Sequence, residues 1–159
     1  MALLARMVRR TRWYPVSEKL PAACLIDLGA PDNILSFWRA DRVPDDIKEI
    51  VVAIAAKREN LQHVDLALVD EDDVTRAGIK LDETEGDTPY AAARLLHRLV
   101  VELSADDVLA MAKLIEAKND YPRYTKREVR DLMLAAVRQQ RLALRELEDN
   151  VQEDLTKHL

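Results

Sequence analysis

Two short segments near the start of the chain have the spacing of strands, residues 23–28 and residues 34–40, and in the first Cys24, Ile26 and Leu28 alternate with Ala23, Leu25 and Asp27. A period of two is typical of β-strands, in which successive side chains point to opposite faces of a sheet. Between them lies Gly29-Ala-Pro-Asp-Asn33, which is made of residues that turns favour. The pattern therefore predicts a β-hairpin in this part of the chain.

Helical and strand periodicities follow one another through the middle of the chain. Pro44 and the two aspartates behind it are typical of a helix start. Apolar residues then recur at helical spacing at Ile47, Ile50, Val51 and Ile54. Alternation predicts strands over residues 64–69 and 97–103, and Ser104-Ala-Asp-Asp107 has the pattern of a capping box before another helix.

The last part of the chain gives the longest helical signal. Thr125-Lys-Arg-Glu128 is a capping box, and neither proline nor glycine follows it as far as Leu159. An uninterrupted helix of more than about 30 residues would be roughly 45 Å long at 1.5 Å per residue. That length exceeds the breadth of about 30–35 Å expected for a domain of this size.

This predicted helix carries two faces of different chemistry. At about 100° per residue, five arginines fall within one narrow sector: Arg127, Arg130, Arg138, Arg141 and Arg145. An apolar stripe lies beside them and continues to the end through Leu144, Leu147, Val151 and Leu155. An exposed stripe of this kind needs either a partner or a fold-back of the helix to cover it.

Together the elements predict an α+β fold with a small, mostly antiparallel sheet, packed helices and a long C-terminal amphipathic helix. Residues 1–11, which are basic and free of acids, are predicted to form an N-terminal tail. Residues 12–140 are predicted to form the α+β domain. Residues 141–159 are predicted to be a helical extension that serves association.

Composition narrows the chemistry. The three glycines leave no room for a phosphate-binding P-loop or a dinucleotide fingerprint, so we expect no cofactor. Cys24 is the single cysteine, which rules out an internal disulfide and favours a reducing, cytoplasmic location. One cysteine and three histidines do not supply a conventional structural zinc site. No stretch is apolar enough for a membrane span, and we expect no membrane partner.

An acidic cluster, Asp70-Glu-Asp-Asp73, follows the strand predicted at residues 64–69. Carboxylates at the end of a strand can gather around Mg²⁺. As a calcium loop the segment fails, because Thr75 stands where glycine is required and Leu81 where glutamate is required. A solvated acidic segment is the simpler interpretation.

Three functions are consistent with these patterns. The first is a non-catalytic interaction protein, an accessory subunit that docks on a protein partner or self-associates into a homo-oligomer or larger complex through Leu144, Leu147, Val151 and Leu155. The second is an accessory factor that binds nucleic acid with the arginine face, which the net charge of −5 disfavours. The third is a magnesium-dependent enzyme using the acids after Asp70. Alternatively, the helix folds back and its arginines pair with the acids between Asp70 and Asp87. In that case neither a protein partner nor a nucleic acid would be needed to explain the arginine face and the apolar stripe. We expect the first function and no enzymatic activity.

Overall fold

A computed structural model describes residues 2–13, 22–29 and 34–159, which are built around one six-stranded sheet. The strands are β1 (Leu3–Met7), β2 (Leu35–Ala40), β3 (Val64–Asp70), β4 (Leu81–Glu83), β5 (His97–Val100) and β6 (Arg123–Tyr124). They lie in the order β4-β5-β2-β1-β3-β6, and each neighbouring pair is antiparallel. β1 therefore lies inside the sheet, between β2 and β3, which run parallel to each other.

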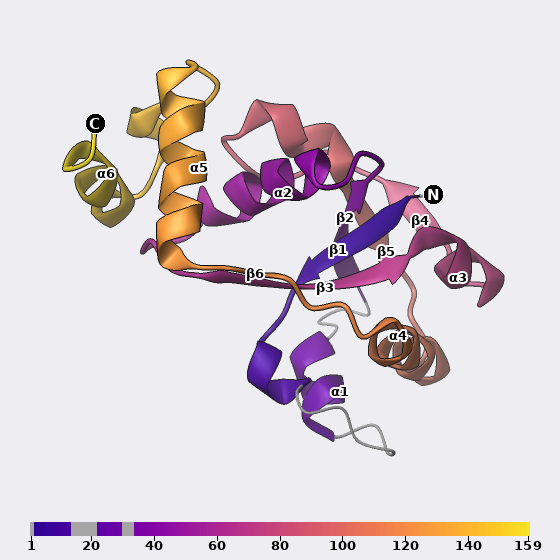
Figure 1. The fold of residues 1–159 in the computed structure, drawn as a ribbon. Helices are drawn as coiled ribbons and strands as arrows, with labels where there is room; N and C mark the ends of the chain where they lie inside the picture. The colour runs from indigo at the N-terminus through magenta and orange to yellow at the C-terminus, as the bar shows by residue number, and fades with distance from the viewer. Residues whose placement is uncertain (1, 14–21, 30–33) are drawn as a thin grey trace.

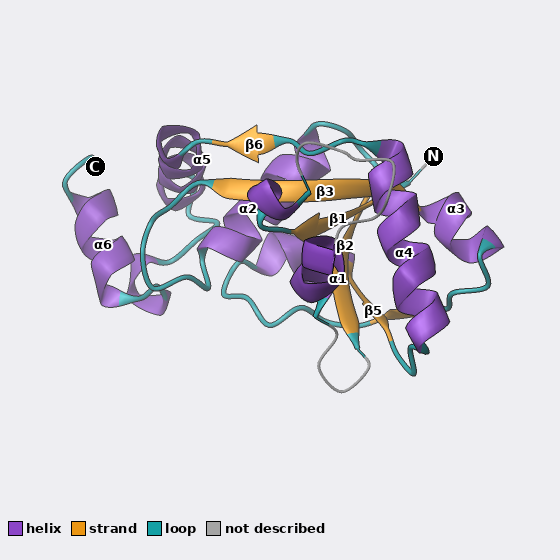
Figure 2. Ribbon diagram, turned by 90° about the horizontal axis from the view of Figure 1, so that it is seen from below, coloured by secondary structure: helices purple, strands orange, loops and turns teal. Residues whose placement is uncertain are grey.

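Helices cover both faces of the sheet, giving three layers (Figure 1). The helices are α1 (Ala22–Leu28), α2 (Asp45–Ala55), α3 (Glu71–Arg76), α4 (Ala105–Lys118), α5 (Lys126–Arg138) and α6 (Asp149–Thr156), with 3-10 turns η1 (Arg10–Arg12), η3 (Ala91–Leu96) and η4 (Leu144–Glu146). α2 and α5 lie over one face, whereas α1 and α4 lie over the other, as Figure 2 shows from the α1 side. None of the helices in the described part of the chain combines the length and apolar character that crossing a bilayer requires.

Strand alternation divides the apolar residues between two cores. On β3, Leu66 and Leu68 face α2 and α5, whereas Ala67 and Val69 face α1 and α4. Six of the seven residues of β3 are buried, because both faces of this strand are covered. β1 follows the same rule, with Leu4 in the core beneath α1 and α4 and Ala5 in the other core.

Several elements agree with the sequence pattern. The α+β class is confirmed, as are β2, β3, and α2 directly after Pro44. α4 begins at the capping box of Ser104, whose hydroxyl accepts the backbone N–H of Asp107 at 3.1 Å. α5 begins at the capping box of Thr125, whose hydroxyl accepts the backbone N–H of Glu128 at 3.2 Å. These start signals are local, which is why the sequence is sufficient to place them.

The predicted hairpin is wrong in its first strand. Residues 22–28 form α1, not a strand. Cys24 and Leu28 are four residues apart, so a helix brings both to one face, and both are buried there. Over so short a segment, alternation and helical spacing fit the same apolar residues. The predicted turn falls largely on residues 30–33, which lie outside the described residues.

The predicted long C-terminal helix is also wrong. α5 ends at Arg138, and Gln140 takes a left-handed conformation with φ of 59°. The backbone N–H of Arg141 then bonds to Ala136 O at 2.9 Å, which closes the helix end. The chain turns back through η4 to α6, so the break needs neither glycine nor proline.

The predicted division into tail, domain and extension does not match the packing. Residues 3–7, placed in the tail, form β1 inside the sheet and pair with both neighbours. Leu147, Val151 and Leu155 of the predicted extension join the core that α2 and α5 form with the sheet. Both ends of the chain therefore contribute to the packing of the domain.

Candidate functional site

A pocket of about 590 Å³ opens where β1 ends, α2 has just ended and β3 begins. Five arginines line it: Arg6, Arg9, Arg10, Arg58 and Arg123. They outnumber the two aspartates in its wall, Asp27 and Asp65, by three. We call this site the basic pocket. Its excess of positive charge stands out because the chain as a whole carries a net charge of −5.

Arg6 reaches the basic pocket because of its position on β1. It lies two residues after Leu4 and so shares a face with it, but Leu4 is fully buried whereas Arg6 is only partly buried. Its Nη1 donates to Ser36 O and its Nη2 to Leu28 O, both at 3.0 Å. The guanidinium also lies 5.9 Å from the ring centroid of Phe37. Burial lowers the pKa of Arg6, although the charge of Asp27 acts in the opposite direction.

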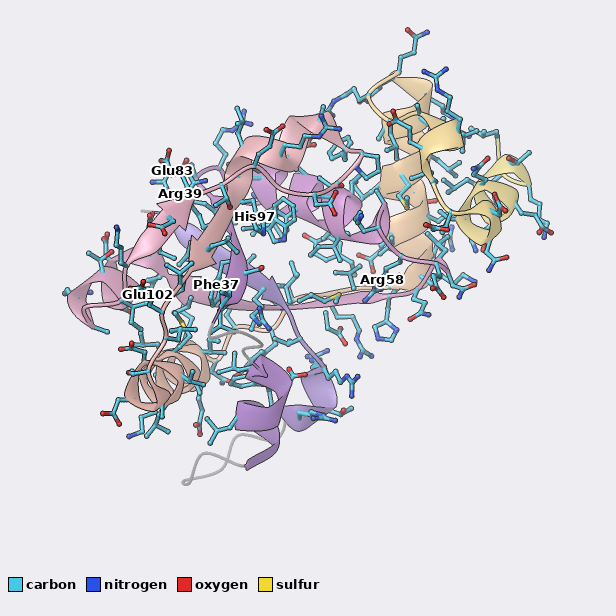
Figure 3. All side chains as sticks on the ribbon, turned by 180° about the vertical axis from the view of Figure 1, so that it is seen from behind. Phe37, Arg39, Arg58, Glu83, His97 and Glu102 are labelled. Atoms are coloured by element: carbon cyan, nitrogen blue, oxygen red, sulfur yellow. The ribbon has the colours of Figure 1, made fainter. Side chains whose placement is uncertain are left out.

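Arg58 enters the basic pocket from the segment that follows α2. In Figure 3 it lies on the side of the molecule away from α4. Its Nη1 donates to His63 O at 2.6 Å, and its Nη2 contacts Met7 Sδ at 2.9 Å. Burial lowers the pKa of Arg58, with Asp65 opposing the shift. Both acceptors are uncharged, so they stabilise the position of Arg58 without neutralising it.

The two carboxylates of the basic pocket are engaged by other groups. Asp65 accepts Arg123 Nε at 2.6 Å and Nη2 at 2.8 Å. Burial acts to raise the pKa of Asp65, but the hydrogen bond and charge of Arg123 outweigh it, and the pKa is lowered. Asp27 Oδ2 accepts the backbone N–H of Arg9 at 3.0 Å and Trp13 Nε1 at 2.7 Å. These acids therefore fix the walls of the pocket.

Arg6 and Arg58 consequently have no carboxylate partner among the described residues. Removing a charged group from water costs free energy unless an opposite charge or strong hydrogen bonds compensate it. A guanidinium presents a planar set of donors that matches the oxygens of carboxylate or phosphate. The arrangement can therefore bind an anion, which would supply the missing opposite charge.

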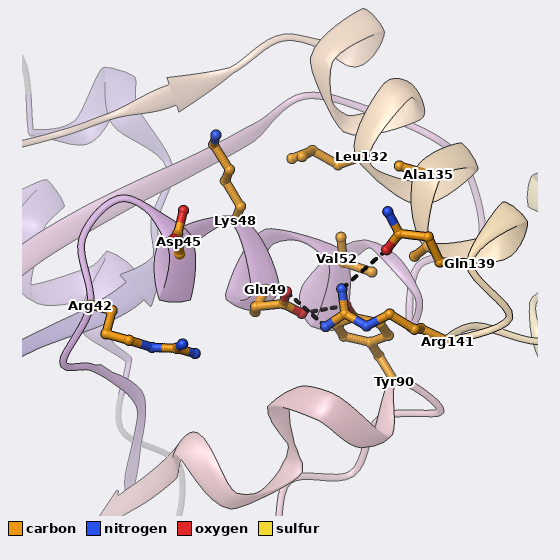
Figure 4. Close-up of a pocket in the computed structure, with 11 residues that line it drawn as sticks. Arg42, Asp45, Lys48, Glu49, Val52, Tyr90, Leu132, Ala135, Gln139 and Arg141 are labelled. Atoms are coloured by element: carbon orange, nitrogen blue, oxygen red, sulfur yellow. Dashed lines mark hydrogen bonds and ion pairs between the residues drawn. The ribbon is translucent and has the colours of Figure 1, made fainter.

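A second pocket of about 430 Å³ lies between α2 and α5 (Figure 4). Here Arg141 has a carboxylate partner in Glu49. Glu49 accepts the hydroxyl of Tyr90, and it also accepts Arg141 Nη2 at 2.8 Å. Burial, followed by the hydrogen bond and charge of Glu49, raises the pKa of Tyr90 well above its usual value. The group ties α2 to the segment after α5 and leaves the phenol protonated at neutral pH.

The predicted arginine face is divided among contacts within the chain. Arg130 Nε lies 3.1 Å from Asp154 Oδ1, and Arg138 Nη2 donates to His158 O at 3.1 Å. Arg141 bonds to Glu49, as described above. Arg127 and Arg145 are exposed. The fold-back alternative thus occurs, but the acids involved are Glu49 and Asp154 and not those between Asp70 and Asp87.

The predicted partner face is largely covered by the chain itself. Leu147, Val151 and Leu155 are buried, and Leu144 is half-buried against the same core. The apolar stripe is therefore real, but α5, α6 and the segment between them fold back and cover it. The expectation that these residues contact a second chain stays a prediction.

The acids after Asp70 are held in separate ion pairs. Asp70 pairs with Lys118 at 3.1 Å and Glu71 with Arg39 at 2.7 Å, while Asp73 pairs with Arg76. Within residues 2–13, 22–29 and 34–159, no three histidine, cysteine or acidic side chains are grouped to hold a metal ion. The predicted magnesium ligands are thus paired with separate basic residues and do not surround one common point.

The basic pocket was missed because its parts are distant in sequence. Arg9 and Arg10 do signal positive charge, but they fall within residues 1–11, which the sequence pattern assigns to a tail. Leu3–Met7 is only five residues long, too short for a clear strand pattern. Comparison with protein-family models, with curated proteins and with solved structures finds no match for this chain.

Proposed function

We propose that this chain is a binding protein for a phosphate-bearing ligand, which it holds in the basic pocket. One observation carries the proposal. Arg6 and Arg58 line the same pocket and donate to uncharged acceptors, while Asp27 and Asp65 are occupied by other donors. An anion entering the pocket would meet two guanidiniums that no carboxylate of the described residues neutralises.

Phosphate suits this surplus better than a single carboxylate does. A phosphate monoester carries about −1.5 to −2 charges at neutral pH and presents three acceptor oxygens. Several guanidiniums can share those oxygens, and arginine stays protonated even where burial lowers its pKa. The ligand is recognised by side chains, which is consistent with a chain that has too few glycines for a phosphate-binding loop.

The proposal retains the expectation that the protein binds without catalysing a reaction. In the basic pocket, Asp27 and Asp65 accept short hydrogen bonds from arginine, tryptophan and backbone donors. A carboxylate held in this way is a poor general base, because its lone pairs are engaged and the pKa of Asp65 is lowered. These features support a binding role.

Calorimetric titration with inorganic pyrophosphate tests the proposal. We expect saturable binding at a stoichiometry of one, weakening as salt is raised. Replacing Arg58 with glutamine should lower the affinity at least about tenfold, since a hydrogen bond to a charged group contributes roughly 1.5–3 kcal/mol. Arg127→Gln is the matched control, because it removes one exposed arginine outside the pocket.

Two results would overturn the proposal. One is the absence of pyrophosphate binding to a folded wild-type protein at low salt. The other is an equal loss of affinity in Arg58→Gln and Arg127→Gln, which would mean that pyrophosphate responds to net charge and not to the basic pocket. Thermal melts of both variants establish that each is folded.

A further inference from the structure

A second hollow of about 390 Å³ adjoins the basic pocket. Arg6, Met7 and Arg58 line both spaces, so they form a shared wall. Beyond this wall the character changes, because the lining becomes mainly apolar through Trp38, Ala53 and Ile54. We call this space the Trp38 hollow. A positively charged pocket and an aromatic, apolar hollow therefore adjoin each other across two arginines.

Trp38 is held in place from the β5 side. The ring of His97 meets it edge-on, with centroids 4.9 Å apart and an interplanar angle of 72°. Behind it lies Gly86, where an added Cβ would be 2.7 Å from Trp38 Cη2. His97 is fixed in turn by Thr84, whose hydroxyl lies 2.7 Å from its Nδ1. A side chain held in this way loses little further freedom when a ligand packs against it.

We infer that the phosphate-bearing ligand is a nucleotide, with its phosphates in the basic pocket and its base against Trp38. This inference rests on the proposed function. An aromatic wall beside a cluster of arginines is the chemistry that binds a base and its phosphate together. Ser36 also lines the Trp38 hollow and offers a polar group to the edge of a base, whereas Lys57, which lines it too, pairs with Asp87 at 3.1 Å.

Charge indicates how many phosphates fit. Arg6 and Arg58 together carry two positive charges that no carboxylate of the described residues pairs with. A nucleoside diphosphate carries at least that many negative charges at neutral pH. A free nucleotide is favoured over a nucleic acid strand, because a long polyanion would continue past the pocket along a protein of net charge −5.

The first test compares ADP with inorganic pyrophosphate by calorimetry, without added divalent metal. ADP, GDP, CDP and UDP cover the four bases. At least one of them should bind about tenfold or more tightly than pyrophosphate, since stacking of a base on an aromatic side chain strengthens binding by roughly that factor or more. Geranyl diphosphate tests whether the Trp38 hollow prefers an apolar chain to a base. A single-stranded oligonucleotide tests whether the protein prefers a polyanion to a free nucleotide.

The second test uses a matched pair at Trp38. Trp38→Leu should reduce affinity for the best nucleotide about tenfold and leave pyrophosphate affinity within about twofold. Trp38→Phe keeps an aromatic ring and should retain most of the difference between nucleotide and pyrophosphate. Because Trp38 also packs against the core, the pyrophosphate titration of each variant shows that its basic pocket is intact.

The outcomes separate this inference from the proposed function. If pyrophosphate binds and no nucleotide binds more tightly than pyrophosphate, the inference that the ligand is a nucleotide is wrong. The basic pocket is then a phosphate site without a site for the base. Tighter binding of geranyl diphosphate, or of the oligonucleotide, than of every nucleotide also overturns it. Absence of pyrophosphate binding overturns the proposed function itself.

Discussion

The predicted arginine face and the basic pocket each contain five arginines, yet these are used in different ways. On and after α5, Arg130, Arg138 and Arg141 turn to acceptors in their own chain, two of which are the carboxylates Asp154 and Glu49. In the basic pocket, the acceptors that Arg6 and Arg58 meet within the described part of the chain are carbonyl oxygens and a thioether. The spacing of arginines on a helix therefore predicts a positively charged surface. Whether those guanidiniums are available to a ligand depends on which carboxylates the fold places next to them.

This comparison predicts that charge changes near α5 alter stability and that charge changes in the basic pocket alter binding. The largest effect should come from Glu49. In Glu49→Ala, the buried Tyr90 hydroxyl loses its acceptor and Arg141 its carboxylate, so the free energy of unfolding should fall by about 2–3 kcal/mol. Urea denaturation measures the loss, and pyrophosphate affinity should be unchanged.

Glu49→Gln is the control for this variant, because it keeps an acceptor for Tyr90 and removes only the charge. It should therefore cost less than Glu49→Ala. A reduced affinity for pyrophosphate in a folded Glu49 variant would contradict the separation of the two arginine sets.

Asp154 gives a smaller effect that depends on pH. Burial acts to raise its pKa, but Arg130 and Lys126 outweigh burial, so the pKa of Asp154 is lowered in the folded protein. The ion pairs therefore stabilise the fold at pH above the usual carboxyl pKa of about 4, and this contribution is lost as pH falls through the lower, folded pKa.

Asp154→Asn should thus be less stable than the wild type by up to about 1 kcal/mol at pH 7. The two proteins should converge in stability as the pH is lowered toward 3. Chemical denaturation at several pH values measures this convergence. A difference that stays constant with pH would show that the carboxylate charge of Asp154 does not stabilise the packing of α6 on α5.

The smallest effect is expected for the two exposed arginines. Arg127 and Arg145 have no ion-pair partner among the described residues. The double variant Arg127→Gln, Arg145→Gln should change the free energy of unfolding by no more than about 0.5 kcal/mol. Pyrophosphate affinity should also stay within twofold. Loss of oligomeric mass or of nucleic acid binding in this variant would instead support the functions first inferred from the helix.

The sequence predicts those parts of the fold that depend on local signals. The capping boxes of Ser104 and Thr125 mark helix starts through bonds that span only three residues. The break at Gln140 has no such signal, because its cause is the burial of Leu147, Val151 and Leu155 against helices distant in sequence. The apolar stripe is present, and the same chain covers most of it.

The site was harder to predict than the fold. Arg6 and Arg58 are 52 positions apart in the printed sequence, and their relation depends on the insertion of β1 beside β3. Trp38 lies in the strand predicted over residues 34–40, but the hollow beside it is formed by the end of α2. Neither helical nor strand periodicity encodes such neighbours, because both describe one element at a time.

The position of β1 has a consequence for how the protein folds. β2, α2 and β3 form a parallel unit with a gap one strand wide, and β1 fills that gap with antiparallel pairs on both sides. These pairs join residues 3–7 to residues some 30 and 60 positions later, and such distant contacts form slowly. Until β1 is inserted, β2 and β3 expose unpaired backbone edges, which invite aggregation. Arg6 and Met7 belong to β1, so the wall between the basic pocket and the Trp38 hollow forms only when β1 pairs with β2 and β3.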